Sequence, residues 1–144
     1  MEEISIRKCD DRDLDRLAEL NKQLIEDEMF DSDFDIAQLR ERMKDFIHSE
    51  YCAFMFNSGN RLIGYALVNI IQKPYYIRHF FICRDVRRLG YGKKAFHKLL
   101  GTLNVNTVDL EVLSWNERGI GFWHSLGFKE RSKYLRLEGR KKYK

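Results

Sequence analysis

Residues 75–103 read YYIRHFFICRDVRRLGYGKKAFHKLLGTL, and this stretch decides the fold. Its first part, up to Cys83, is an apolar and aromatic run with the length and β-rich composition of a buried strand. A charged turn follows, and Gly90 and Gly92 then open a helix with one apolar face. That face consists of Ala95, Phe96, Leu99 and Leu100. A strand, a glycine-rich basic turn and a helix in this order predict an α/β fold built around this unit.

The turn between the strand and the helix has the properties of an anion site. The first backbone N–H groups of a helix lack an acceptor inside it, and the helix dipole adds partial positive charge there. At Gly90 and Gly92 no Cβ atom keeps an anion away from the backbone. Only Asp85 opposes the basic side chains around the turn, which are Arg84, Arg87, Arg88, Lys93 and Lys94. The turn suits a phosphate or pyrophosphate, and an ordinary surface turn with solvated charges has the same composition.

Two common phosphate-binding motifs do not describe this turn. The chain has no GxxxxGK[ST] sequence, which excludes a Walker A loop. A dinucleotide fingerprint needs a third glycine, and the chain has Ala95 at that position.

Two segments of the chain resemble the GNAT acetyltransferases (Gcn5-related N-acetyltransferases). Arg87-Arg88-Leu89-Gly90-Tyr91-Gly92 is similar to the family's Q/R-x-x-G-x-G/A segment. Downstream, Asn116 followed by Phe122-Trp123-His124-Ser125-Leu126-Gly127-Phe128 is similar to the family's N…FYxxxGF segment. The two segments occur in the family's order and spacing, and the surrounding pattern extends the resemblance over nearly the whole chain.

Hydrophobic periodicity predicts the remaining elements. Strands are expected over 4–9, 51–56, 62–72, 75–83, 108–113 and 128–137. Helices are expected from the Asp10–Asp13 caps to Glu26–Glu28, from the Asp35 cap through Ile47, and over about 90–103 and 116–126. The resemblance implies a single GNAT-like N-acetyltransferase domain over 1–144. In that fold a mixed, mostly antiparallel central sheet carries helices on both faces, and the central strand splays away from the next one.

Composition restricts the class of protein and its partners. A chain of 144 residues with 44% hydrophobic and 33% charged residues is expected to form one soluble domain. The sequence shows no signal peptide and no apolar run of membrane-spanning length, so we expect a cytoplasmic protein without a membrane partner. Cys9, Cys52 and Cys83 have no metal-ligand spacing and predict buried thiols and no metal. The net charge of +4 suits a polyanionic cofactor. The basic tail at 140–144 is interpreted as a solvated chain end, so no nucleic-acid partner is expected.

The resemblance implies transfer of an acetyl group directly from acetyl-CoA to an amine of a small molecule or a protein. The pyrophosphate would lie on the turn, and the pantetheine arm would pair with the end of the central strand as an added strand. Asn116 would hydrogen-bond the pantetheine or cap its own helix. The cofactor-binding residues implied are Phe80, Phe81, Ile82, Arg87, Arg88, Leu89, Gly90, Tyr91, Gly92, Lys93 and Asn116.

The catalytic residues implied are Trp123, His79 and Glu111. Trp123 occupies the position where the family often has a tyrosine that donates a proton to the leaving thiolate. An indole N–H donates only a hydrogen bond, so the general acid stays open. Alternative proton donors are His124, Tyr91 and Tyr134. A general base is needed because an attacking amine must be neutral, and both His79 and Glu111 are candidates beside the splayed strands.

Substrate-binding candidates lie at the end of the first helix and on the central strand. Glu26 and Glu28 are suited to hold a cationic acceptor or to act as the base, and Arg78 is suited to hold an acceptor's carboxylate or to pair with them. Each of these charges also fits an ordinary ion pair. A catalytically silent GNAT fold that binds acyl-CoA as a sensor or interaction module is the alternative function. A homodimer is compatible with the sequence, and no sequence feature requires it.

Overall fold

The computed structural model describes residues 3–139 and confirms the central unit. The aromatic run forms strand β4 (Tyr75–Ile82), a short 3-10 turn η2 follows (Arg84–Val86), and the helix α3 spans Tyr91–Leu103. On α3, Ala95, Phe96 and Leu99 are buried as the periodicity predicts. The predicted basic tail, 140–144, lies outside the described residues.

The other elements agree with the predicted order up to the fourth helix. They are β1 (Ile4–Lys8), η1 (Asp11–Asp13), α1 (Leu14–Asp27), α2 (Ile36–Ile47), β2 (Tyr51–Ser58), β3 (Arg61–Asn69), β5 (Val108–Leu110) and α4 (Glu117–Ser125). The expected Asp35 cap is confirmed, because its side chain accepts the N–H of Gln38 while the Gln38 side chain accepts the N–H of Asp35. Such a reciprocal pair satisfies two N–H groups that a helix start otherwise leaves unbonded.

No helix within residues 3–139 combines the length and apolar composition needed to cross a membrane.

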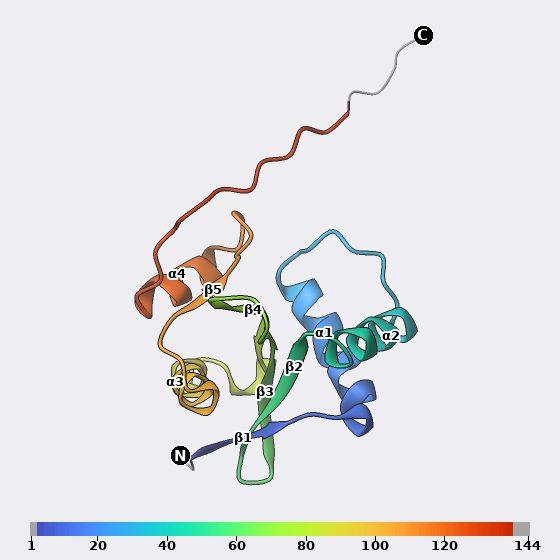
Figure 1. Ribbon diagram of the computed structural model, residues 1–144, viewed down its shortest axis with the longest axis vertical. Helices are drawn as coiled ribbons and strands as arrows, with labels where there is room; N and C mark the ends of the chain where they lie inside the picture. Colours follow the sequence, from blue (N-terminus) through green and yellow to red (C-terminus); the bar gives the residue numbers. More distant parts are fainter. Residues whose placement is uncertain (1–2, 140–144) are drawn as a thin grey trace.

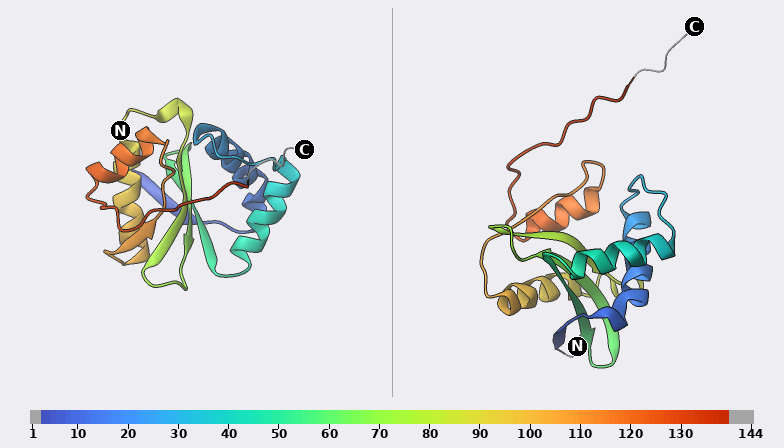
Figure 2. Two further views of the ribbon diagram at one scale, coloured as in Figure 1. Left: turned by 90° about the horizontal axis from the view of Figure 1, so that it is seen from above. Right: turned by 45° about the vertical axis from the view of Figure 1, so that its right-hand side comes forward.

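The five strands form one sheet in the order β1-β2-β3-β4-β5. Neighbouring strands run antiparallel from β1 to β4, and β5 is parallel to β4. Seen from above in Figure 2, α1 and α2 cover one face of the sheet while α3 and α4 cover the other. This arrangement confirms the predicted mixed, mostly antiparallel sheet with helices on both faces.

Strands β4 and β5 separate soon after they begin, as the resemblance implies. Only Tyr75, Tyr76 and Ile77 of β4 have partners on β5, and the last pair joins Ile77 to Leu110. The register between β3 and β4 shifts at this point, because Leu67 faces His79 while the next residue, Val68, faces Ile77. Arg78 is therefore the extra residue of a β-bulge, a feature that bends a strand and re-aims its side chains. Beyond Arg78 no residue of β4 pairs with β5, and we call the region between the two diverging strands the slot.

Two predicted strands in the C-terminal part of the chain differ from the structure. The strand expected over 108–113 ends at Leu110, so Glu111 lies beyond it and is exposed. The final strand expected over 128–137 is absent, and residues 129–139 are exposed and leave the domain after α4 (Figure 1). The segment has β-forming residues, but Tyr134, Leu135 and Leu137 are 79–98% exposed because no neighbouring strand covers them. A strand becomes stable only when an edge pairs with it and one face is buried, and alternation in sequence supplies neither.

Candidate functional site

The turn before α3 presents free backbone N–H groups, as the sequence predicts. Arg88 and Gly90 have left-handed backbone angles, with φ of +64° and +84°, and they direct the chain sharply into the helix. Gly90 is the N-cap of α3 and has no side chain that could cap the helix. The first bond within the helix is from the Lys94 N–H to the Gly90 carbonyl, at 3.4 Å. The N–H groups of Tyr91, Gly92 and Lys93 precede it and are available to an anion.

The two glycines of the turn have different structural roles. Nothing lies within 4 Å of a Cβ built on Gly90, so its positive φ is what favours glycine there. A Cβ on Gly92 would lie 3.1 Å from Phe122 of α4 and 3.7 Å from Ile82 of β4. Gly92 therefore allows α4 and the end of β4 to approach the start of α3, which the sequence did not indicate.

Arg87 fastens the turn to the rest of the domain. Its Nε donates to the Ile82 carbonyl at 2.8 Å, and its Nη2 donates to the Asp27 carboxylate at the end of α1. Arg84 donates to the same carboxylate at 2.7 Å. Partial burial would raise the pKa of Asp27, but the hydrogen bonds from Arg84 and Arg87 outweigh it and hold the pKa below its usual range. Arg87 thus positions the turn through its side chain, while Arg88, Leu89 and Lys93 are exposed beside the free N–H groups.

The open edge of β4 lies directly next to this turn. The Cys83 N–H donates to the Ile63 carbonyl of β3 at 2.8 Å. Because backbone groups alternate in direction along a strand, Phe81 also points its N–H and carbonyl toward β3. Phe80 and Ile82 point theirs toward the slot, where the Ile82 carbonyl already accepts from Arg87. Of the three strand residues predicted to bind cofactor, Phe80 and Ile82 have the required orientation, and Phe81 does not.

His79 is buried on the face of the sheet that α1 and α2 cover. Its Nδ1 lies 3.0 Å from the Tyr65 hydroxyl, and the edge of its ring packs against Phe46. Burial, together with the positive charges of Arg78 and Arg42, lowers the pKa of His79 to about 3. The imidazole is therefore neutral at pH 7 and much less basic than a free histidine.

The lowered pKa of His79 predicts a specific loss of stability in mild acid. An unfolded histidine gains a proton below about pH 6.5, whereas folded His79 stays neutral down to about pH 3. The stability that neutral His79 supplies is thus present above pH 6.5 and lost as the pH falls toward 3. Between pH 7 and 5, the unfolding free energy of the wild type should fall relative to that of His79→Gln by up to about 2 kcal/mol. Urea titrations of both proteins measure this difference, and a difference independent of pH would contradict the assignment.

The predicted acidic residues at the end of α1 have separate environments. Glu26 is exposed and pairs with Arg84 at 3.3 Å. Glu28 is half-buried, and burial, followed by the charge of Asp27, raises the pKa of its carboxyl. The Glu28 carbonyl accepts the Trp115 indole N–H at 2.9 Å, which ties α1 to the segment between β5 and α4.

On the other side of the slot, Glu111 follows the last residue of β5. Burial of Tyr76, followed by the charge of nearby Glu111, raises the pKa of the tyrosine to about 12. Glu111 and Glu28 thus come from different elements, one following β5 and one following α1.

Trp123 is 9% exposed and lies inside a cluster of aromatic rings on the face that α3 and α4 cover. Its ring centroid is 4.8–5.7 Å from those of Phe80, Phe96, Phe122 and Phe128. The ring therefore contributes to the core between α4 and the sheet, which is the ordinary packing role for such a residue. The alternative proton donors are dispersed, since Tyr91 is buried while His124 and Tyr134 are exposed.

Asn116 caps α4, because its side-chain oxygen accepts the Gly119 N–H at 3.0 Å. A Cβ on Gly119 would lie 2.4 Å from the Asn116 side-chain nitrogen. We therefore expect Gly119→Ala to expel the cap and to lower the unfolding free energy by about 1–2 kcal/mol.

Gly121, two residues further along α4, has nothing within 4 Å of a built Cβ and is the matched control. Gly121→Ala should raise the unfolding free energy by about 0.5–1 kcal/mol. Thermal unfolding of both variants measures the contrast. Equal effects of the two substitutions on stability would contradict a stabilising role for the Asn116 cap.

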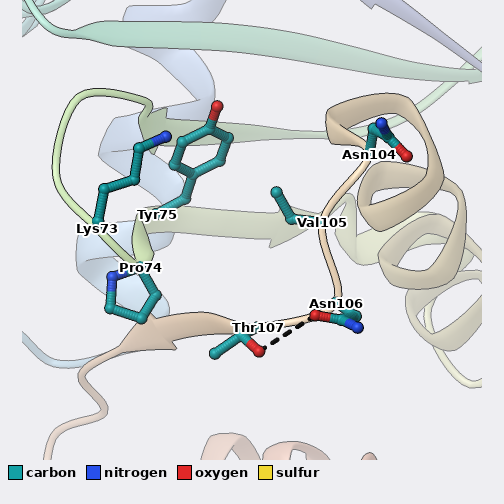
Figure 3. Close-up of a pocket in the computed structure, with 7 residues that line it drawn as sticks. All are labelled: Lys73, Pro74, Tyr75, Asn104, Val105, Asn106 and Thr107. Carbon is teal, nitrogen blue, oxygen red and sulfur yellow. Dashed lines mark hydrogen bonds between the residues drawn. The ribbon is translucent and has the colours of Figure 1, made fainter.

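An open hollow of about 530 Å³ lies at the other end of β4. Figure 3 shows its lining, which comes from the Lys73–Tyr75 turn and from residues 104–107 after α3. The Lys73 amino group lies 4.1 Å from the centre of the Tyr75 ring. This hollow is separated from the Gly90 turn by the length of α3, about 20 Å, and it contains none of the predicted site residues.

Several residues of the site were not predicted from the sequence. Asp27 is the anchor for both turn arginines, Tyr65 bonds His79, and Arg42 lies beside Arg78. Their partners are far away in sequence, and no local motif connects them. A weak signal existed only for Asp27, which belongs to the acidic Glu26–Glu28 cluster.

A family model described as "Acetyltransferase (GNAT) family" matches residues 15–128 of the chain. A search of curated proteins gives no match. Solved structures are similar, including a possible acetyltransferase from Clostridium difficile 630, with a TM-score of 0.74 and 16% identity over 96% of this chain and 99% of that chain.

Two of the similar structures contain a cofactor. A predicted acetyltransferase from Clostridium acetobutylicum with acetyl-CoA has a TM-score of 0.71 and 17% identity, over 94% of this chain and 96% of that chain. An aminoglycoside N-acetyltransferase in complex with CoA has a TM-score of 0.74 and 17% identity, over 97% of each chain. At these identities the likeness establishes the shared fold.

Proposed function

The chain belongs to the acetyltransferase (GNAT) family, and we propose that it transfers an acetyl group directly from acetyl-CoA to an amine. One observation carries the proposal. The unbonded N–H groups at the start of α3 lie at the end of the slot whose wall is the unpaired edge of β4. The first feature suits a diphosphate, and the second suits a chain of amides that pairs like a strand.

The chain's own residues divide the binding task. The N–H groups of Tyr91, Gly92 and Lys93 hold the diphosphate, and the side chains of Arg88 and Lys93 add positive charge beside it. The backbone of Phe80 and Ile82 pairs with the amides of the arm. A backbone N–H of β4 close to the bulge at Arg78 then donates to the thioester carbonyl oxygen. This hydrogen bond stabilises the negative charge that develops on that oxygen.

The acetyl group passes directly to the acceptor in this proposal. The amine nitrogen bonds the carbonyl carbon, the carbon–sulfur bond breaks, the nitrogen loses a proton and the thiolate gains one. A cysteine relay has no support, because burial raises the pKa of Cys83 at the end of β4 and raises that of Cys9 to about 12. A buried thiol with a raised pKa is a weak nucleophile.

We assign removal of the amine proton to a carboxylate rather than to His79. With a pKa of about 3, His79 holds a proton too weakly to serve as a base near pH 7. Glu28 has a raised pKa and Glu111 follows the split strand, so both are candidates for the base. No proton-transfer role is assigned to Trp123, whose ring packs in the core.

A cytoplasmic location is proposed because the three cysteines are free and buried, as is usual in a reducing compartment.

Calorimetric titration with acetyl-CoA and an assay of thiol release with a panel of amines test the proposal. We expect binding and acceptor-dependent release of CoA, with a pH–rate profile that changes in Glu28→Gln or Glu111→Gln and keeps its shape in His79→Gln. Tight binding without release for any amine would favour the silent sensor. Absence of binding would contradict both functions.

A further inference from the structure

Ion pairs within the protein neutralise much of the negative charge in the acidic cluster at the end of α1. Asp27 accepts from both Arg84 and Arg87, and Glu26 pairs with Arg84. Glu28 is half-buried, and its raised pKa favours the neutral form more than in water. The cluster therefore offers little net negative charge to a cationic acceptor, in contrast to its appearance in the sequence.

Two arginines nearby have the opposite character. The guanidinium carbons of Arg42 on α2 and Arg78 on β4 lie 5.2 Å and 4.8 Å from the centre of the Phe46 ring. Arg42 also lies 5.1 Å from Phe34, and Arg78 lies 6.0 Å from Tyr51. Within residues 3–139, neither guanidinium forms an ion pair with a carboxylate.

This arrangement is unfavourable without a ligand. Burial, followed by the charge of Arg78, lowers the pKa of Arg42, which means that half-buried Arg42 and exposed Arg78 repel each other. Aromatic faces hold the two groups in position by cation–π attraction but do not neutralise them. An anion that both guanidinium groups reach would reduce this repulsion, and each group is a planar donor that suits a carboxylate.

The position of the pair coincides with the reacting end of the slot. Arg78 is the bulge residue of β4 and comes immediately after Ile77, the last residue paired to β5. Its guanidinium lies over Phe46 and Tyr51, so the pair is on the face covered by α1 and α2. The titratable groups that surround it are Glu28, Tyr51, Tyr65, Tyr76, His79 and Glu111.

We infer that Arg42 and Arg78 bind the carboxylate of the acceptor, so that the acceptor is an amine that carries its own carboxylate. This inference rests on the proposed function. The arginines hold the anionic end, while Glu28, which follows α1, and Glu111, which follows β5, are the candidate bases for the amine proton. A polycation such as a polyamine would meet two uncompensated guanidinium groups and would bind poorly.

Binding of reaction products tests the inference without depending on turnover. The probes are N-acetylated amino acids and their C-terminal amides, titrated by calorimetry into protein saturated with CoA. At least one acid should bind roughly 10- to 100-fold more tightly than its amide, because a carboxylate makes charge-assisted bonds that an amide lacks. Arg42→Gln and Arg78→Gln should each remove most of this preference, and Arg78→Lys should restore only part of it.

Arg40→Gln is the matched control on the same helix, because Arg40 pairs with Asp15 on the surface and does not contact Phe46. It should keep the preference for the acid. Equal binding of every acid and its amide, or an unchanged preference in both Arg42→Gln and Arg78→Gln, would overturn the inference.

Measurements of turnover distinguish a failure of the inference from a failure of the proposed function. Amino acids should be acetylated with a higher kcat/KM than the amines formed by removing their carboxylate, and the loss in the arginine variants should appear mainly in KM. If the decarboxylated amines are acetylated as well as the amino acids, the inference fails and the acetyltransferase function stands. If CoA does not bind, the function itself fails.

Discussion

Gly90→Val should weaken acetyl-CoA binding by at least about 100-fold. Gly90 has φ of +84°, where a β-branched side chain is strained by roughly 1–3 kcal/mol, so the turn must change its shape. A new shape redirects the N–H groups of Tyr91, Gly92 and Lys93, which are the donors proposed for the diphosphate. The backbone conformation is the reason for the effect, because nothing lies within 4 Å of a Cβ built on Gly90. Calorimetric titration measures the dissociation constant.

The matched control is Gly101→Val, at the opposite end of the same helix. Gly101 is exposed, and nothing lies within 4 Å of its built Cβ. This variant should bind acetyl-CoA with a dissociation constant within about twofold of the wild type, because it changes only local helix propensity. If Gly90→Val and Gly101→Val bind alike, the turn does not hold the cofactor.

Asp27→Ala should lower both the stability and the cofactor affinity. The substitution leaves Arg84 and Arg87 without their shared carboxylate, and the Arg87 side chain is only 20% exposed. An unfolding free energy lower by about 2–3 kcal/mol is expected, since a partly buried cation loses its partner. Because Arg87 fixes the start of the turn, the dissociation constant for acetyl-CoA should also rise by about tenfold. Urea denaturation and calorimetry measure the two effects.

Asp15→Ala provides the control, as Asp15 belongs to the same helix and pairs with Arg40. Its side chain is 85% exposed, so solvent screens the pair, and a change within about 0.5 kcal/mol is expected. If Asp27→Ala and Asp15→Ala have similar effects on stability and affinity, the Arg87 anchor has no special importance.

The elements with strong local patterns were predictable. The apolar stripe of α3, the Asp35 cap of α2 and the aromatic run of β4 each depend on residues close together in sequence, and all three are confirmed. The open N–H groups before α3 follow from the same local chemistry. For this reason the part of the site proposed to hold the diphosphate was the most predictable.

The ends of the strands were less predictable, because the residue at which a strand ends depends on the strand that pairs with it. The strand expected to continue to residue 72 ends at Asn69, whose side chain accepts the N–H groups of Ile71 and Gln72 and forms a turn. The segment expected to form a strand over 128–137 pairs with no strand among residues 3–139, although β1 and β5 each leave one edge of the sheet free. Composition alone does not encode either outcome.

The charge of the acceptor side of the site could not be predicted, because it depends on ion pairs between residues that are far apart in sequence. In sequence, the Glu26–Glu28 cluster favours a cationic acceptor, but Arg84 and Arg87, about 60 residues away, neutralise Asp27. Arg42 carries no motif and becomes notable only because the fold places it beside Arg78 over Phe46. The charge of a binding site is thus decided by which ions pair internally, and this requires the structure.

The most direct test of the central claim is the response of the backbone amide resonances to CoA in nitrogen-labelled protein. We predict that the largest chemical-shift changes occur at Arg88–Lys93 and at Phe80 and Ile82, with little change around the Lys73–Tyr75 hollow. Changes concentrated at the hollow, with the Arg88–Lys93 amides unaffected, would contradict a cofactor held by these N–H groups and by the free edge of β4.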